Sequence, residues 1–488
     1  MPCPPGGCWE PSRRLPIPFG LCFLLLAASQ SLPMTANNLL IYRRLNLTTE
    51  QASAYFLAYF LPSFTAPIFG WITDRGGVRA RYWTIVISLA LKACALAAFA
   101  FGLVRSLGSL YLFGILAPVA HTAALATIDG ALCSRGGGSA GDTSLARGRQ
   151  AAKLAWQTTG DLLAALVSLL FAATDAPLPV VYGLTACVNA SAACASHFLP
   201  HHPPPVNSRT AVATAEGCAP GEREAGLLAS EVRVPSDSTS DDAAAAGAAA
   251  DATAASSASR RAAAGAVIAA LAIAVYMLPP TADVATGSYV AQPNSTASWV
   301  LSAQQLSSMA GGLGGIGLAA RLDLPLHQAL PLGAVATAAS QLISLMVYAL
   351  AGRKRNEAGV HLDGSAGGVA VLLLEPAASN ALRLVGVVPI LAMCAAASEG
   401  AGEGAAYGLV AAADAVGALA AGTISTIMVG ALHIGAPPEA SWARLPLMVA
   451  VCASCKVALV PAVLLLLRLR EWVMPGKSDG YSSSVLRR

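Results

Sequence analysis

Long apolar runs separated by short polar segments dominate the chain. A helix needs about 20 residues to cross roughly 30 Å of hydrocarbon, and on that rule the pattern predicts twelve membrane-spanning helices in an all-α protein. The expected spans are residues 15–35, 52–73, 82–104, 109–130, 151–173 and 178–199, followed by 263–280, 298–320, 326–351, 368–397, 403–432 and 444–468. Two groups of six spans are typical of transporters that are built from two halves.

A polar tract, residues 200–262, separates the two groups. It opens with "PHHPPPVNS" and contains few aromatic or large aliphatic side chains, so it predicts a disordered linker on the cytoplasmic side. The expected organisation is therefore a first half over residues 1–199, this linker, a second half over residues 263–470, and a flexible tail over residues 471–488.

Composition supports an integral, multi-pass membrane protein. Of the 488 residues, 55% are hydrophobic and 11% are charged, and the mean hydropathy is +0.60, whereas soluble domains average about 25% charged residues. The plasma membrane and a plastid or other organelle envelope are equally compatible with these values. We expect a monomer that contacts lipid and a small molecule, with no nucleic-acid partner, no cofactor and no metal.

Two patterns that resemble enzyme motifs have simpler explanations. "GLGGIG", residues 312–317, fits a dinucleotide-binding pattern, but no strand precedes it, so close helix packing is the better interpretation. The Ser, His and Asp residues form no nucleophile elbow. The sequence therefore carries no enzyme signature.

The distribution of basic residues predicts a cytoplasmic N-terminus, because cytoplasmic loops are rich in Lys and Arg. With that orientation the sequons at Asn46 and Asn294 lie on the opposite side, where both are candidate glycosylation sites. Arg43, Arg44 and the run at residues 353–355 oppose this orientation. The residues that favour it are Arg75, Arg79, Arg81, Arg135, Arg147, Arg149, Arg321, Arg468, Arg470 and Lys477.

The segment "GWITDRGGVRAR", residues 70–81, follows the second expected span. Glycine permits close approach and a tight turn, and Asp74 can accept hydrogen bonds from Arg79, Arg81 or a neighbouring helix N-terminus. The pattern resembles the signature between helices two and three of the major facilitator superfamily. That resemblance implies a gating loop formed by Gly70, Asp74, Arg75, Gly77, Arg79 and Arg81.

Ionisable residues inside spans are costly and normally face a cavity or a partner. Lys153, Gln157 and Asp161 recur every four residues and share one stripe of a helix, which we expect to face the bundle. Lys153 can instead extend to the cytoplasmic interface.

Glu403 and Asp414 are eleven residues apart, which places them on one helical face, with Tyr407 beside Glu403. Asp414 has Lys456, Arg383 or a proton as its candidate partner, and a purely structural buried pair is the alternative.

Three segments resemble the folate-biopterin transporter family. They are "FLPSFTAPIFGWITDRGGVRARYW", "ATIDGALCSRG", which matches at Asp129, and "VVPILAMCAAASEGAGEGAAYGLVAAADAVGAL", which matches at Pro389, Glu403, Tyr407 and Leu409. Asp414 stands where the family usually has Asn. The resemblance implies a major facilitator fold and transport of folate or pterin-like solutes by alternating access.

Such a solute needs aromatic stacking and a cation for its carboxylates. Tyr55, Trp156 and Tyr407 are the stacking candidates, Arg383 and Lys456 are the cations, and Asp129, Glu403 and Asp414 are the candidate proton carriers. Two alternatives stay open: a transporter for a sugar, drug or amino acid, and a membrane receptor or scaffold that transports nothing.

Overall fold

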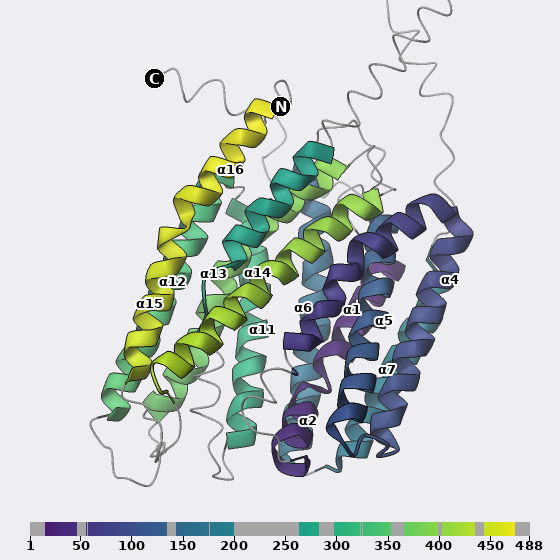
Figure 1. The fold of residues 1–488 in the computed structure, drawn as a ribbon, viewed down its shortest axis with the longest axis horizontal. Coiled ribbons are helices and arrows are strands. Elements are labelled where there is room, and N and C mark those ends of the chain that lie inside the picture. The colour runs from purple at the N-terminus through teal and green to yellow at the C-terminus, as the bar shows by residue number, and fades with distance from the viewer. Residues whose placement is uncertain are drawn as a thin grey trace, which may run out of the picture.

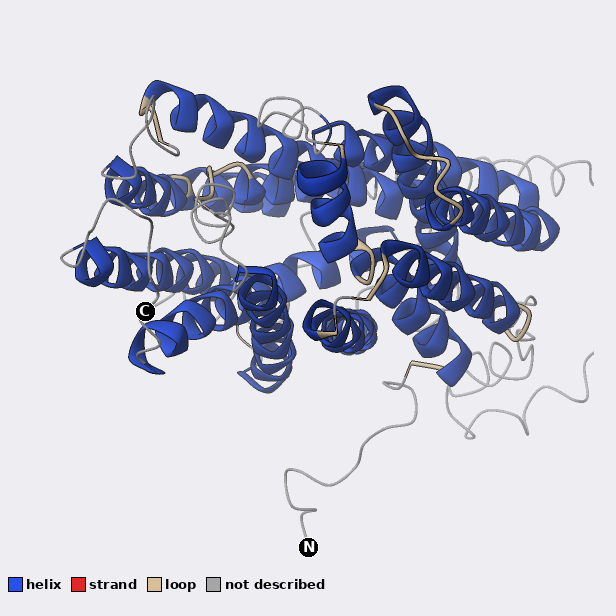
Figure 2. Cartoon of the chain, turned by 90° about the horizontal axis from the view of Figure 1, so that it is seen from below, coloured by secondary structure: helices blue, strands red, loops and turns tan. Residues whose placement is uncertain are grey.

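The computed structural model describes residues 15–45, 55, 57–133, 143–174, 176–199, 263–282, 297–322, 324, 326–352, 366–398, 403–434 and 444–473. All regular structure within these ranges is helical, as expected (Figure 2). The linker, both sequons and the last residues of the tail lie outside the described residues.

The described helices form two groups that lie side by side (Figure 1). The first group, purple to blue, contains α1 (Ile17–Ser31), α2 (Met34–Leu39), α4 (Ala66–Ala100), α5 (Leu107–Cys133), α6 (Thr143–Ala173) and α7 (Leu178–Ser196), with a 3-10 turn η3 (Leu61–Thr65) before α4. The second, teal to yellow, contains a helix Ala263–Met277, then α11 (Ala297–Leu322), α12 (Leu326–Gly352), α13 (Ala366–Ser398), α14 (Glu403–Ala431), α15 (Leu445–Ala458) and α16 (Val460–Val473). The division of the chain into two six-helix halves remains a prediction.

Seven helices in the described ranges are long and apolar enough to cross a membrane, and two shorter apolar helices, Ile17–Ser31 and Ala263–Met277, accompany them. One of the seven, Leu57–Ala100, covers the second and third expected spans together. Each expected span contains helical residues, whereas twelve separate crossings remain a prediction.

The expected turn at residues 70–81 is a sharp kink at Gly77 between two helical segments of α4. Helical structure continues through this segment within α4, and only Gly77 departs from it, with φ 64° and ψ −160°. An L-residue pays a steric penalty at such angles and glycine does not. The turn expected after the second span therefore lies at Gly77.

The first helical path is broken near its middle, which the sequence pattern did not predict. α1 ends at Ser31, α2 begins at Met34, and a π-helical turn from Leu40 to Arg44 completes the path. Pro33 lacks an N–H and disfavours a continuous helix. The Leu32 carbonyl at the break accepts a hydrogen bond of 3.0 Å from the buried Ser168 hydroxyl of α6.

The glycine-rich segment of α11 packs against α13, as the sequence predicted for "GLGGIG". A Cβ atom on Gly311 would lie 2.6 Å from the Cα of Ala377, and one on Gly315 would lie 2.6 Å from the Cα of Ala381. Real Cβ atoms do not approach this closely, so the two backbones require glycine here. The segment serves helix packing.

We expect Gly315→Ala to destabilise the protein by about 1–3 kcal/mol, because an added methyl group forces two packed backbones apart. Gly317→Ala is the matched control, since a Cβ at Gly317 meets no atom within 4 Å, and it should leave stability unchanged or slightly raised. Thermal unfolding of both variants in detergent measures the difference. Equal effects of the two substitutions would contradict the packing role.

Candidate functional site

Asp74 joins the two halves at one end of the bundle. Its Oδ1 accepts a hydrogen bond of 3.1 Å from the Gly404 N–H, and its Oδ2 accepts one of 2.9 Å from the Ala405 N–H. The first N–H groups of a helix have no partner within the helix and carry a partial positive charge, so a carboxylate satisfies both needs at once. Of the partners expected for Asp74, the neighbouring helix N-terminus is confirmed.

Arginine supports this contact from the same half. Arg81 Nη2 lies 3.7 Å from Asp74 Oδ1, and Arg81 Nε donates to the Thr73 carbonyl at 3.4 Å. Arg75 instead lies over the Trp71 ring, 4.3 Å from its centroid, and Arg79 is exposed. Within the predicted gating segment, Asp74 and Arg81 therefore form the contact, and Gly77 forms the bend.

Glycines bring α14 close to α4 and α5. A Cβ on Gly70 would lie 2.8 Å from the Ala405 nitrogen, one on Gly130 would lie 3.0 Å from the Gly404 Cα, and one on Gly408 would lie 2.6 Å from the Ala66 carbonyl oxygen. Figure 1 shows α14 crossing diagonally from the second half to the top of the first. We call the contact of Asp74 with Gly404 and Ala405 the latch.

A second contact between the halves joins the start of α6 to α11 and α13. Ala151 packs with Ile316, Ala319 and Leu384 in one buried apolar cluster. In Figure 1 the start of α6, the end of α11 and the latch lie toward the end of the bundle where N and C are marked. Both contacts join helices of different groups at this end of the bundle.

Asp129 and Lys153 form a buried ion pair beside the latch. Lys153 Nζ lies 2.6 Å from Asp129 Oδ1, and their side chains are 5% and 4% exposed. Lys153 also lies 5.3 Å from the centroid of the Phe23 ring. Extension of Lys153 to the interface, the alternative left open by the sequence, is therefore wrong. Asp129 precedes Gly130, which touches Gly404, so the pair lies next to the contact between the halves.

Three consecutive polar residues at the end of α1 each reach a different neighbour. Ser29 accepts a hydrogen bond from Lys92, Gln30 donates to the Tyr59 hydroxyl, and Ser31 donates to Asp161. Successive residues of a helix point about 100° apart, so a central helix can serve several neighbours. This geometry places Asp161 toward the bundle, as its stripe predicted, and Gln157 is half-buried on the same helix.

Lys92 and His121 were missed by the sequence analysis. Lys92 is 1% exposed and lies 3.0 Å from His121 Nδ1. A single lysine near the middle of the third expected span and a histidine in the fourth were the available signals, because ionisable groups at that depth are rarely incidental.

Two of the three predicted stacking residues, Tyr55 and Trp156, pack against other residues of the protein. Tyr55 is 1% exposed and lies edge-on to Tyr111, with 5.8 Å between the ring centroids. The Trp156 ring lies against Gly20 of α1, where a Cβ would come within 2.5 Å of the ring. The helical position of Tyr407 is described, but its side chain and that of Glu403 lie outside the description.

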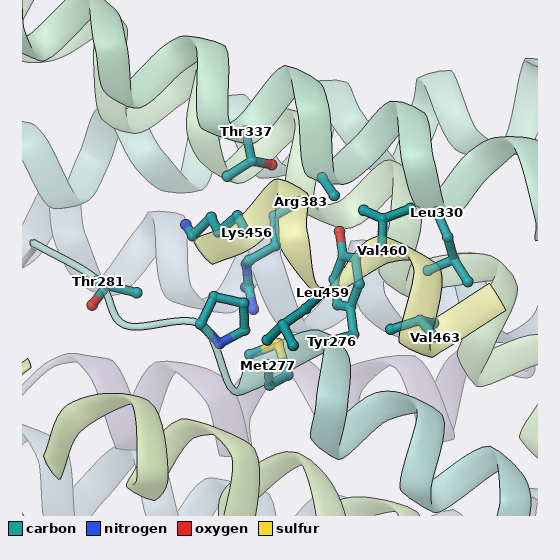
Figure 3. A pocket seen from close by; sticks show the side chains of 12 residues that line it. Tyr276, Met277, Thr281, Leu330, Thr337, Arg383, Lys456, Leu459, Val460 and Val463 are labelled. Atoms are coloured by element: carbon teal, nitrogen blue, oxygen red, sulfur yellow. The ribbon is translucent and has the colours of Figure 1, made fainter. Parts of the chain in front are cut away.

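A cavity of about 70 Å³ in the second half brings together both predicted cations. Its polar lining includes Arg383, Lys456, Thr337 and the Tyr276 hydroxyl (Figure 3). This volume holds a few water molecules and is well below the roughly 300–1,000 Å³ of pockets that hold drug-sized ligands. The described state therefore does not enclose a folate-sized solute in this cavity.

Arg383 is positioned by its own helix. Its Nη2 donates to Asn380 Oδ1 at 3.2 Å, and Asn380 Nδ2 donates to the Ser308 carbonyl of α11 at 2.8 Å. Asp414 on α14 is accessible and lies close enough for its charge to interact with that of Arg383. Arg383 is thus one candidate partner of Asp414 whose charge interacts with it in the structure.

Comparison with solved structures identifies the fold. Two structures of the nucleoside transporter NupG match nearly the whole chain, one of them a D323A mutant. The mutant structure has a TM-score of 0.54 at 14% identity and covers 92% of this chain and 99% of its own; the other has a TM-score of 0.52 at 15% identity and covers 94% and 100%. This chain has the major facilitator fold. No protein-family model matches the sequence, and no curated protein matches it significantly.

Proposed function

We propose that the protein is a secondary transporter that moves a folate- or pterin-like anion between its two halves by alternating access. The observation that carries this proposal is the latch. A carboxylate of one half holds a helix N-terminus of the other, and such a contact can break and re-form without unfolding either half. Rigid halves joined by reversible contacts are what alternating access requires.

The polar side chains between the helices suit such a solute. Arg383 and Lys456 offer cations for carboxylates on the side of the second half. On the side of the first half, Asp161 and Gln30 offer a carboxylate and an amide near the break in the first helical path. Together they can hold an anionic group and the N–H donors of a heterocycle at the two ends of one molecule.

A second candidate is a nucleoside-like solute, which the two NupG structures favour. Uptake of labelled folic acid, biopterin, uridine and adenosine into proteoliposomes at two pH values separates the candidates. Faster uptake of folic acid or biopterin than of the nucleosides supports the first. Uptake of uridine or adenosine alone supports the second. If no solute is taken up faster than by protein-free vesicles, transport of both classes is contradicted.

Substitution of Arg383 tests the anion-binding role. We expect Arg383→Gln to raise the KM for folic acid about 10- to 100-fold, because a hydrogen bond to a charged group contributes about 1.5–3 kcal/mol. The KM for biopterin, which lacks the glutamate carboxylates, should change far less. Arg105→Gln is the control, because Arg105 is exposed and, in the described contacts, its side chain donates only to the Gly102 carbonyl. Equal rises for both solutes would contradict the assignment.

A further inference from the structure

Lys92, His121 and Ser29 form a buried polar cluster in the first half. Lys92 Nζ donates to Ser29 Oγ at 2.7 Å and lies 3.0 Å from His121 Nδ1. The three side chains come from α4, α5 and α1, and Lys92 is 1% exposed. A basic group at this depth lowers the stability of the protein, and ionisable residues inside membrane spans commonly have a functional role.

The cluster lies beside the break in the first helical path. Ser29 is in the last turn of α1, three residues before Leu32, and Pro33 follows. In transporters made of two halves, coupling ions bind near the middle of the membrane, where a helix is interrupted. His121 is half-buried whereas Lys92 is enclosed, so the imidazole is the more accessible of the two basic groups.

Carboxylates on the surrounding elements are engaged elsewhere in the described structure. Asp129 on α5 pairs with Lys153 of α6, Asp161 on α6 accepts from Ser31, Asp74 on α4 accepts from α14, and Asp414 on α14 lies near Arg383. Among the side chains that the structure describes, the other titratable groups on the elements around the cluster are Cys22, Tyr55, Tyr59, Arg75, Arg79, Arg81, Tyr82, Cys94, Tyr111, Arg149, Tyr182, Cys187 and Cys194. The contacts described for Lys92 are thus with a hydroxyl and an imidazole.

The hydrogen bond between two basic nitrogens restricts the charge of the cluster. Lys92 can donate to His121 Nδ1 only when that nitrogen carries no proton. A proton on Nδ1 instead requires an uncharged lysine amine as its acceptor. Two cations at 3.0 Å in an apolar interior would repel strongly. The pair therefore holds one excess proton or none.

We propose that Lys92 and His121 are the site that binds and releases the proton co-transported with the solute. This inference rests on the proposed transport function and adds to it a proton carrier outside the carboxylates Asp129, Glu403 and Asp414. The proton binds to His121 or Lys92 from one side of the membrane and leaves to the other side after the halves have changed orientation. Ser29 orients the lysine amine and is a positioning residue.

The test uses the full chain in proteoliposomes with whichever of folic acid, biopterin, uridine and adenosine the wild type takes up. An inward proton gradient, with pH about 5.5 outside and about 7.5 inside, should drive accumulation by the wild type. His121→Asn keeps an acceptor for Lys92 but cannot carry the proton. We expect this variant to lose gradient-driven accumulation at least about tenfold and to retain exchange of labelled for unlabelled solute, because exchange needs no net proton movement. Lys92→Met should likewise lose gradient-driven accumulation and retain exchange.

His197→Asn is the matched control. His197 Nδ1 also has a hydrogen-bond partner, the Tyr82 hydroxyl at 2.9 Å, but this pair is exposed at the end of α7. The control should accumulate solute as the wild type does. Accumulation by His121→Asn at the wild-type level overturns the proposal, and so does loss of both accumulation and exchange, which would indicate a structural or solute-binding role.

A measurement without solute separates failure of this proposal from failure of the transport function. Proton binding by the cluster makes the Tm of the detergent-solubilised protein depend on pH. His121→Asn should reduce the change in Tm between about pH 5.5 and 8.5. His197→Asn should leave the change in Tm over this range as in the wild type. Identical Tm profiles for wild type and His121→Asn would overturn the proton site even if no tested solute is transported.

Discussion

Asp129→Asn is expected to destabilise the protein by about 3–5 kcal/mol. The substitution removes the carboxylate that lies 2.6 Å from Lys153 Nζ, and the side chain of this lysine is only 5% exposed. Removing one member of a buried ion pair costs this much because the remaining charge stays desolvated. Thermal and denaturant unfolding in detergent measures the loss.

A double substitution provides the control for Asp129. Asp129→Asn combined with Lys153→Met removes both charges and fills the lysine volume with an apolar chain, so it should recover most of the lost stability. If the loss of unfolding free energy in the double variant equals the sum of the losses in the two single variants, Asp129 and Lys153 do not stabilise the protein through their interaction. Transport should remain weaker in the double variant, because Asp129 adjoins Gly130, which packs on the first turn of α14.

Asp74→Asn is expected to reduce the initial rate of uptake by about tenfold or more. An amide has one oxygen where the carboxylate uses two, so the N–H of Gly404 or Ala405 loses its acceptor. A hydrogen bond to a charged group contributes about 1.5–3 kcal/mol, and a negative charge at a helix N-terminus adds about 0.3–1 kcal/mol. The closed arrangement of this end should therefore become 10- to 100-fold less populated.

The opening of this end can be measured separately from uptake. Ala66 is 1% exposed and its carbonyl faces Gly408, so a cysteine at this position should react slowly with a maleimide while the latch is closed. In a background with all eleven native cysteines replaced, Asp74→Asn should speed the reaction of Ala66→Cys about tenfold. Arg79→Gln is the control, since Arg79 is exposed. An unchanged labelling rate would show that Asp74 does not hold the end closed.

Under the proposed alternating access, the latch is a local contact that biases a global equilibrium. A transporter of this fold alternates between states, and any contact that is present in one state only biases the equilibrium by its own free energy. Arg81 adds little to that bias, because a partly exposed ion pair at 3.7 Å contributes about 0–1 kcal/mol. Asp74 is therefore the member of the segment whose loss should be felt most.

Much of the fold could be predicted from the sequence, and the partners of the buried charges could not. The predicted partners of Asp74 included the helix N-terminus that it contacts, because a carboxylate can accept hydrogen bonds from a helix N-terminus and glycine permits the close approach. Lys153 was open to two explanations, since a lysine near a span end can reach the interface or turn inward. Lys92 was overlooked because its partners, Ser29 and His121, lie on two other helices far apart in the chain.

The sequence alone determined that this is a helical, multi-pass membrane protein, because a span must be apolar and long enough to cross hydrocarbon, and both properties are local. The tertiary structure decided which side of each span faces which neighbour. A span that is apolar on all sides has no amphipathic pattern to indicate its inner face. The break at Pro33, the kink at Gly77 and the meeting of Asp129 with Lys153 depend on contacts between helices, and these are set only when the helices pack.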